Sequence, residues 1–224
     1  MKLTKEQLLQ IDNYVSNSGI KYYDVKNEII DHFATILEQK LAENPKLDFK
    51  QEIANIQDSF SDTGFKKLLE EKTKSVKNQF LKQSLQHLIS FLKLPKILIT
   101  VSIFGLLIFI MNFINDKETF FSILGFILIF MGFRLLFNVN MRDTKKETFL
   151  VLNMSMYFFN AFYLGVMIFN FITRNRNEES YLNNTFNYLE LIVFMLLILF
   201  YWSGEHVYYQ TKKVVKKQYP YVVV

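Results

Sequence analysis

Four apolar stretches, each about twenty residues long, constrain this chain more than any other feature. They cover about residues 97–114, 119–138, 149–173 and 188–209. Crossing ~30 Å of hydrocarbon at ~1.5 Å per residue takes about 20 residues, and a helix pairs its own backbone groups there. The alternative, four buried core helices of a soluble protein, leaves too little polar surface to cover them. The sequence therefore predicts an all-α fold with a four-helix transmembrane bundle.

The positive residues in the short connections predict the orientation of these spans, because lysine and arginine are retained on the cytoplasmic side. Lysines or arginines are concentrated before the first span, in the loop of residues 138–147 and in the tail of residues 210–224. The two remaining loops carry fewer, or balance them with glutamates. We therefore predict that both termini are cytoplasmic and that the tail is a cytoplasmic basic segment.

Charge is distributed unevenly ahead of the first span. Residues 1–65 are acidic on balance, whereas residues 66–96 hold eight lysines against two glutamates. Basic residues beside a hydrocarbon-length segment favour anionic lipid over nucleic acid. We predict that residues 65–96 form a basic amphipathic connector helix, either continuous with the first span, lying on the membrane surface, or simply solvated. Its predicted lipid-facing lysines are Lys66, Lys67, Lys72, Lys74, Lys77 and Lys82.

Residues 1–64 show the pattern of a small cytosolic domain of three helices. Thr4 and Gln7 have the spacing of a capping box, and Leu8, Ile11 and Val15 follow on one helical face. A second helix is predicted over about 23–43, ending before Asn44-Pro45. A third is predicted to start at Asp48, an N-cap residue type, and the segment 61–64 should end it.

The motifs in this first domain also carry a family resemblance. Tyr23-Asp24-Val25, Glu28-Ile29-Ile30-Asp31-His32, the Asn-Pro turn, the Asp-capped helix and Gly64-Phe65 follow one another. This order resembles the HAAS-type helical signalling domains that precede membrane spans in bacterial proteins and are commonly encoded beside PadR-type transcription regulators. The resemblance covers about 65 residues. It implies a signalling or interaction module without catalytic residues, in the bacterial inner membrane, whose partner is a transcription regulator or a membrane complex.

Acidic residues and a histidine of the second helix form the predicted partner-binding surface: Asp24, Glu28, Asp31 and His32. A metal site was the competing interpretation, because Glu28 and His32 are four residues apart and share one side of a helix. No second cluster with ligand spacing occurs in the sequence, so we predict no metal and no cofactor. The ordinary alternative is that Asp24 and Glu28 complement the start of their helix.

Polar residues within the spans are the remaining candidates. Asn153, Tyr157 and Asn160 share one face of the third span beside Ala161 and Gly165, and we predict that this face points into the bundle. It would then form either an interhelical hydrogen bond or a polar permeation path. Glu205 and His206 form a predicted pH-responsive pair, or simply reach the headgroups. Glu190 is expected to pair with Arg174 or Arg176.

The functional prediction follows from these features. The chain has no cysteine, and its motifs include no phosphate loop or nucleophile elbow. We predict a non-enzymatic regulatory or adaptor protein whose cytosolic head binds a protein partner, with membrane lipid as a second partner and a possible homo-oligomer. The alternative is a subunit of a small-molecule or ion transporter or channel, using the Asn153 and Asn160 face. A membrane-bound enzyme using Glu205 and His206 is a third class.

Overall fold

The computed structural model describes residues 2–17, 19–44, 47–59, 65–139 and 147–222, and these residues are helical with no strand among them. Four stretches are long and apolar enough to cross a membrane: α5 (Lys96–Phe113), α6 (Lys117–Phe137), Leu150–Arg174 and α10 (Asn184–Gln218). The third consists of α7 (Leu150–Asn153) and α8 (Ser155–Arg174). The predictions of an all-helical fold and of four helical stretches long and apolar enough to cross a membrane are therefore confirmed for the described residues.

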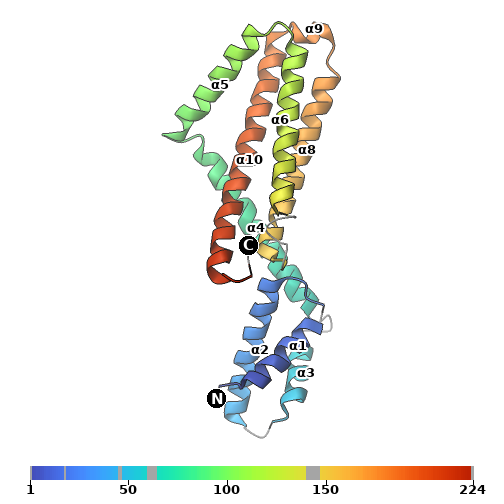
Figure 1. Ribbon diagram of the computed structural model, residues 1–224, viewed down its shortest axis with the longest axis vertical. Coiled ribbons are helices and arrows are strands. Elements are labelled where there is room, and N and C mark those ends of the chain that lie inside the picture. The colour runs from blue at the N-terminus through green and yellow to red at the C-terminus, as the bar shows by residue number, and fades with distance from the viewer. Residues whose placement is uncertain (1, 18, 45–46, 60–64, 140–146, 223–224) are drawn as a thin grey trace. The chain divides into compact units, whose positions relative to one another are not determined.

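The chain divides into two compact units, which are described separately (Figure 1). The head unit comprises residues 1–76 and 146–153, and the span unit comprises residues 77–145 and 154–224. The head unit contains α1 (Lys5–Asn17), α2 (Tyr23–Glu43), α3 (Phe49–Ser59), the first part of α4 (Phe65–Ser90) and α7. The chain passes between the units three times: within α4, where Val76 precedes Lys77, between residues 145 and 146, and where Asn153 precedes Met154.

Local sequence signals set the helix ends of the head unit. The Thr4 N–H donates to Gln7 Oε1 at 2.9 Å and the Gln7 N–H to Thr4 Oγ1 at 3.2 Å, which confirms the predicted capping box. Gly19, two residues beyond α1, has φ +78°, a left-handed conformation that favours glycine. Asp48 Oδ1 accepts from the Lys50 N–H at 3.0 Å, ahead of α3. The predicted stop at 61–64 lies outside the described residues.

The head unit has its own apolar core between α1 and α2. Ile11 and Val15 of α1 are fully buried, as are most of the apolar positions of α2. Leu8, predicted on the same face of α1, is 40% exposed, so that prediction is wrong. The buried residues of α2 recur every four positions, as one face of a helix requires: Val25, Ile29, Phe33, Leu37 and Leu41.

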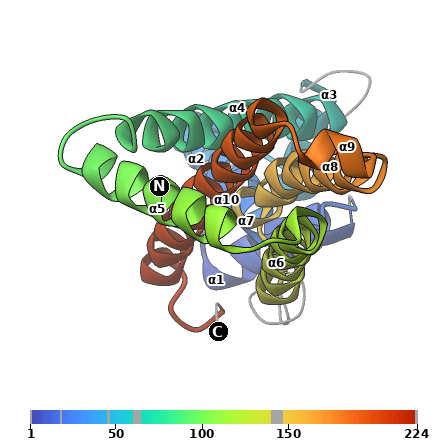
Figure 2. The ribbon, with the colours of Figure 1, turned by 90° about the horizontal axis from the view of Figure 1, so that it is seen from above.

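In the span unit, α6, α8 and α10 pack side by side, and the short α9 (Glu178–Tyr181) lies between α8 and α10 in the chain (Figures 1 and 2). Large aromatic side chains fill the space between them, among them Phe121, Phe158, Phe162, Phe169 and Tyr201. The fourth helix differs: α5 leans away from the other three, and Met111 is its one buried residue (Figure 1).

Two side-chain caps fix where spans begin. Asp116 caps α6 by accepting from the Thr119 N–H at 3.0 Å, and Asn183 caps α10 by accepting from the Thr185 N–H at 3.0 Å. α10 has 35 residues, so it is about 52 Å long at 1.5 Å per residue, against ~30 Å of hydrocarbon. The helix therefore continues beyond the predicted span of 188–209 at both ends.

Candidate functional site

The head unit holds the segment that directly precedes α8, through contacts that we call the junction. Both carboxylate oxygens of Asp24 accept backbone N–H groups, from Leu150 at 2.8 Å and from Val151 at 3.1 Å. The Tyr23 N–H donates to the Thr148 carbonyl at 2.8 Å, and the Tyr23 ring lies 5.5 Å from that of Phe149. Asp24 therefore caps α7 from the distant helix α2, because the first N–H groups of a helix have no partner within it.

Two further hydrogen bonds complete the junction. Thr148 Oγ1 donates to the Lys21 carbonyl at 2.7 Å, and Asn153 Nδ2 donates to the Tyr22 hydroxyl at 3.0 Å. Only Met154 separates Asn153 from the first residue of α8. The start of a membrane-spanning stretch is thus bonded along its whole leading turn to the head unit. Charged and amide groups of this kind give direction and register to a contact as well as energy.

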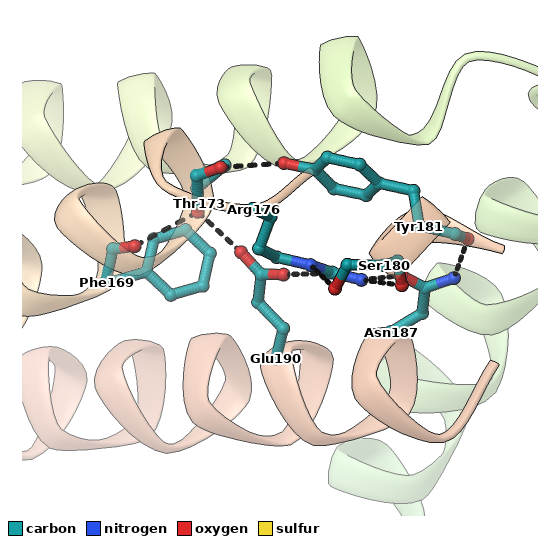
Figure 3. A network of polar contacts seen from close by, with 7 residues as sticks. All are labelled: Phe169, Thr173, Arg176, Ser180, Tyr181, Asn187 and Glu190. Atoms are coloured by element: carbon teal, nitrogen blue, oxygen red, sulfur yellow. Dashed lines mark hydrogen bonds and ion pairs between the residues drawn. The ribbon is translucent and has the colours of Figure 1, made fainter. Parts of the chain in front are cut away.

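A second polar cluster, the arginine network, lies in the span unit around α9 (Figure 3). Arg176 pairs with the Glu190 carboxylate through Nη1, and its Nη2 donates to Asn187 Oδ1 and to the Ser180 carbonyl, each at 2.7 Å. Thr173 Oγ1 donates to the second oxygen of Glu190. The arginine and glutamate side chains are only 8% and 5% exposed. Burial of charges at this level is tolerated only when their hydrogen bonds are satisfied, as they are here.

Aromatic rings complete the surroundings of Arg176. Its guanidinium carbon lies 4.1 Å from the Tyr181 ring centroid and 5.6 Å from that of Phe121. The Tyr181 hydroxyl donates to the Thr173 carbonyl at 2.8 Å. Burial, and then the negative charge of Glu190, raises the pKa of Tyr181 above its usual range, so the phenol stays protonated and remains a donor. The network therefore ties α6, α8, α9 and α10 together, with every polar group of Arg176 and Glu190 used internally.

A stack of two imidazole rings, the histidine pair, joins α4 to α10. The His87 and His206 ring centroids are 3.9 Å apart with planes 7° from parallel. Lys96 Nζ lies 3.3 Å from His87 Nε2 and donates to Ser90 Oγ at 3.0 Å, and Gln210 Nε2 lies 2.9 Å from His206 Nε2. Because an ammonium only donates, His87 Nε2 accepts and the ring is neutral. Burial, then the charges of His206 and Lys96, lowers the pKa of His87 to about 4.

Acidification should therefore loosen α4 from α10. A detached His87 gains its proton near the ordinary value of 6.5, whereas the packed ring resists it down to about 4. The contact is fully stable above pH 6.5 and loses stability as the pH falls from 6.5 to 4. The ring of Trp202, the single tryptophan, has its centroid 6.3 Å from that of Phe91, the residue directly after α4, so its fluorescence reports the change. We expect its emission to shift over this pH range.

Histidine variants provide the control for this titration. His87→Phe keeps a ring without a titrating group and should flatten the emission profile between pH 4 and 6.5. His32→Gln, in the head unit, should leave the profile as it is. A titration that persists in His87→Phe, or that disappears in His32→Gln, would contradict the assignment.

The predicted pair of Glu205 and His206 does not act as a unit. Glu205 lies 2.8 Å from Arg134 of α6, whereas His206 stacks on His87. Adjacent residues of a helix point about 100° apart, so the two side chains reach different neighbours. The pairing is wrong, although His206 itself lies in the histidine pair.

Of the predicted partner-binding residues, two are engaged inside the head unit. Asp24 belongs to the junction, and Glu28 forms a 2.7 Å ion pair with Lys72 of α4. Asp31 and His32 are exposed on α2. The exposed part of the predicted surface is therefore centred on Asp31 and His32.

The predicted lipid-facing lysines also differ in their surroundings. Lys67, Lys74 and Lys82 are exposed, whereas Lys72 pairs with Glu28. Lys77 Nζ lies over the ring of Tyr157, 4.8 Å from its centroid. Lys66 has no described side chain.

The prediction that the polar face of the third span points into the bundle is wrong. Asn153 bonds to Tyr22 in the head unit, Tyr157 is 49% exposed, and Asn160 and Ala161 are exposed. Large aromatic residues of α8, such as Phe158 and Phe162, take the buried face instead. Hydrophobic packing therefore decided which face is buried. Gly165 does pack closely, since a Cβ there would lie 2.7 Å from Leu197 of α10.

Sequence reasoning found part of the arginine network and missed His87. Glu190 was expected to pair with Arg174 or Arg176, and the pairing with Arg176 is confirmed. The signal for His87 is its spacing: Val76, Phe80 and Ser84 of α4 are buried, and the half-buried His87 follows on the same helical face. Within the described ranges, no group of three or more acidic or histidine side chains is placed to hold a metal ion.

Comparison with known proteins adds no relative: no protein-family model, no curated protein and no solved structure matches this chain.

Proposed function

We propose that this is a non-enzymatic regulatory or adaptor protein of the bacterial inner membrane, whose head unit faces the cytoplasm and binds a protein partner. The junction is the observation that carries the proposal. Asp24 of the head unit holds the first turn of the stretch that continues as α8. A partner that displaces α2 would therefore pull directly on a membrane-spanning helix.

The helix α4, which is shared by the two units, supports the same function. α4 runs without a break from the head unit into the span unit, where it contacts α10 through the histidine pair. Rigid elements shared by two units transmit a displacement better than a flexible linker does. The resemblance of residues 1–65 to HAAS-type domains makes a transcription regulator or a membrane complex the natural partner.

Anionic lipid is the second proposed partner. No aspartate or glutamate occurs from Lys72 to Asn115, a segment that includes the exposed Lys74 and Lys82. Each lysine near an anionic membrane surface contributes about 1 kcal/mol of attraction. We propose that these lysines hold α4 at the cytoplasmic surface, which is also where the positive-inside rule places them.

The alternative, a transporter or channel subunit, gains less support. It requires Asn153 and Asn160 to line one polar path. Asn153 donates its amide to Tyr22 of the head unit, and Asn160 is on the exposed side of α8.

Photo-crosslinking from the full chain in native membranes tests the adaptor function. A photoreactive residue replaces Thr35, which is exposed on α2 one turn beyond Asp31. We expect one dominant adduct with a second protein, and Asp31→Lys should abolish it by reversing the charge on the docking surface. Glu43→Lys makes the same charge change on an exposed position of α2 and is the matched control. No adduct, or equal loss in both variants, would contradict the proposal.

A further inference from the structure

Asn160 lies on the exposed side of α8, within a stretch long and apolar enough to cross a membrane. The other asparagines of this stretch, and Asn175 just after it, have partners: Asn153 bonds to Tyr22, Asn170 to the Val166 carbonyl at 2.9 Å and Asn175 to the Phe171 carbonyl at 2.7 Å. Within the described part of the chain, the Asn160 side chain has no hydrogen bond. It lies 14 residues from Arg174, about 21 Å along the helix, which leaves about 9 Å to the far side of ~30 Å of hydrocarbon.

An amide at that depth needs a hydrogen-bond partner. Lipid tails offer none, and an unsatisfied amide in an apolar medium costs several kcal/mol. Ser and Thr relieve the same problem by bonding to their own helix, as Thr211 of α10 does to the Val207 carbonyl. Asn160 makes no such bond, so its partner must come from outside the described chain.

The residues around Asn160 form a regular stripe along the exposed side of α8. Leu164 is 61% exposed, Met167 is 55% exposed and Phe171 is 69% exposed. Together with Asn160, these residues are spaced by four, three and four, which is the 3.5-residue period of a helix seam. Ala161, a small and exposed residue, lies beside Asn160 and allows close approach of another helix. A single polar residue within such a seam fixes register.

The occupant that fits this stripe is a second copy of the same chain. All copies insert with the same orientation, so a two-fold axis along the membrane normal sets the two α8 helices parallel and places each seam residue against itself. Asn160 then meets Asn160, and an amide is self-complementary because it has both donors and an acceptor. We propose that the protein dimerises in the membrane through the α8 stripe of Asn160, Leu164, Met167 and Phe171, with paired Asn160 amides.

A second exposed stripe, on α6, shows why we assign the dimer contact to the stripe that contains an amide. Ile123, Phe126, Phe130 and Phe133 of α6 have the same kind of spacing and are 53–76% exposed, and the first three line a groove of about 540 Å³. This stripe is apolar, and in hydrocarbon an apolar face gains little by exchanging lipid for protein. The α6 stripe therefore serves as an internal control for the α8 stripe.

Cysteine scanning tests the seam directly, because the chain has no cysteine of its own. The full-length protein in native membranes carries one cysteine at Leu164, Met167 or Phe171, and is oxidised. We expect disulfide-linked dimers of this chain at these positions. Cysteines at Ile168 and Ile172, which are 52% and 47% exposed but off the stripe, should link several-fold less, and so should Phe126→Cys on α6.

The amide is tested by dilution in lipid vesicles, with dimer fraction followed by energy transfer between labelled chains. Asn160→Leu should raise the dimer dissociation constant about tenfold, within the range measured for interhelical hydrogen bonds in membranes. Asn160→Gln keeps an amide and should retain most of the association. An unchanged dissociation constant in Asn160→Leu, a monomer at all lipid ratios, adducts with a different protein, or stronger linking on α6 would each overturn the proposal.

Discussion

Replacing Arg176 by Met should lower the free energy of unfolding by about 3–5 kcal/mol, which is the usual cost of removing one partner of a buried ion pair. The variant leaves the Glu190 carboxylate, 5% exposed, with only the Thr173 hydroxyl as a donor. It also removes the hydrogen bond that the guanidinium donates to the side-chain oxygen Oδ1 of Asn187. The desolvation cost of the remaining carboxylate is then no longer offset.

Two further variants separate the effect of breaking the ion pair from the effect of replacing an arginine by a smaller side chain. Arg176→Met with Glu190→Leu removes both charges and should recover much of the loss, since an apolar pair of similar volume is often as stable as the ion pair. Arg174→Met removes an exposed arginine two residues away and should change stability by less than about 0.5 kcal/mol. Reversible unfolding in mixed micelles, followed by Trp202 fluorescence, measures all three. Equal losses for Arg174→Met and Arg176→Met would contradict the role of the network.

Features that depend on residues close together in the sequence could be predicted from it. The bonds between Thr4 and Gln7 join residues three apart, so the capping box was readable from the sequence. The predicted bounds of α2 agree with Tyr23–Glu43, because an Asn-Pro pair cannot continue a helix. The four spans followed from length and apolarity alone. The pair of Arg176 and Glu190, 14 residues apart across one short loop, was within reach of the same reasoning.

Contacts between segments far apart in the sequence could not be predicted from it. Asp24 binds Leu150 at a separation of 126 residues, and no feature near Asp24 distinguishes a cap for a remote helix from a residue that complements its own. His87 and His206 likewise meet only after the helices have packed. The polar face of the third span was assigned inward because amides are costly in lipid, but the aromatic residues of α8 compete for the same interior and bury more apolar area.

Among the glycines that the structure describes, Gly204 should be the least tolerant of a side chain. A Cβ at this position would overlap three ring carbons of Phe158. That ring is 1% exposed, stacks on Phe200 at 4.0 Å and has Phe80 5.9 Å away, so it has no free space into which to move. Overfilling a packed interior usually costs about 1–3 kcal/mol or more. We expect Gly204→Ala to lower the free energy of unfolding by at least this amount.

Gly105→Ala is the matched control, because it makes the same change in α5 where nothing lies within 4 Å of the added Cβ. Alanine is favoured over glycine inside a helix by about 0.5–1 kcal/mol, so this variant should be neutral or slightly stabilising. Phe158→Leu, which frees space beside Gly204, should make Gly204→Ala less costly than it is alone, a coupling that a double-mutant cycle in micelles measures. Additive losses, or equal effects of the two glycine variants, would show that the contact between α8 and α10 is looser than described.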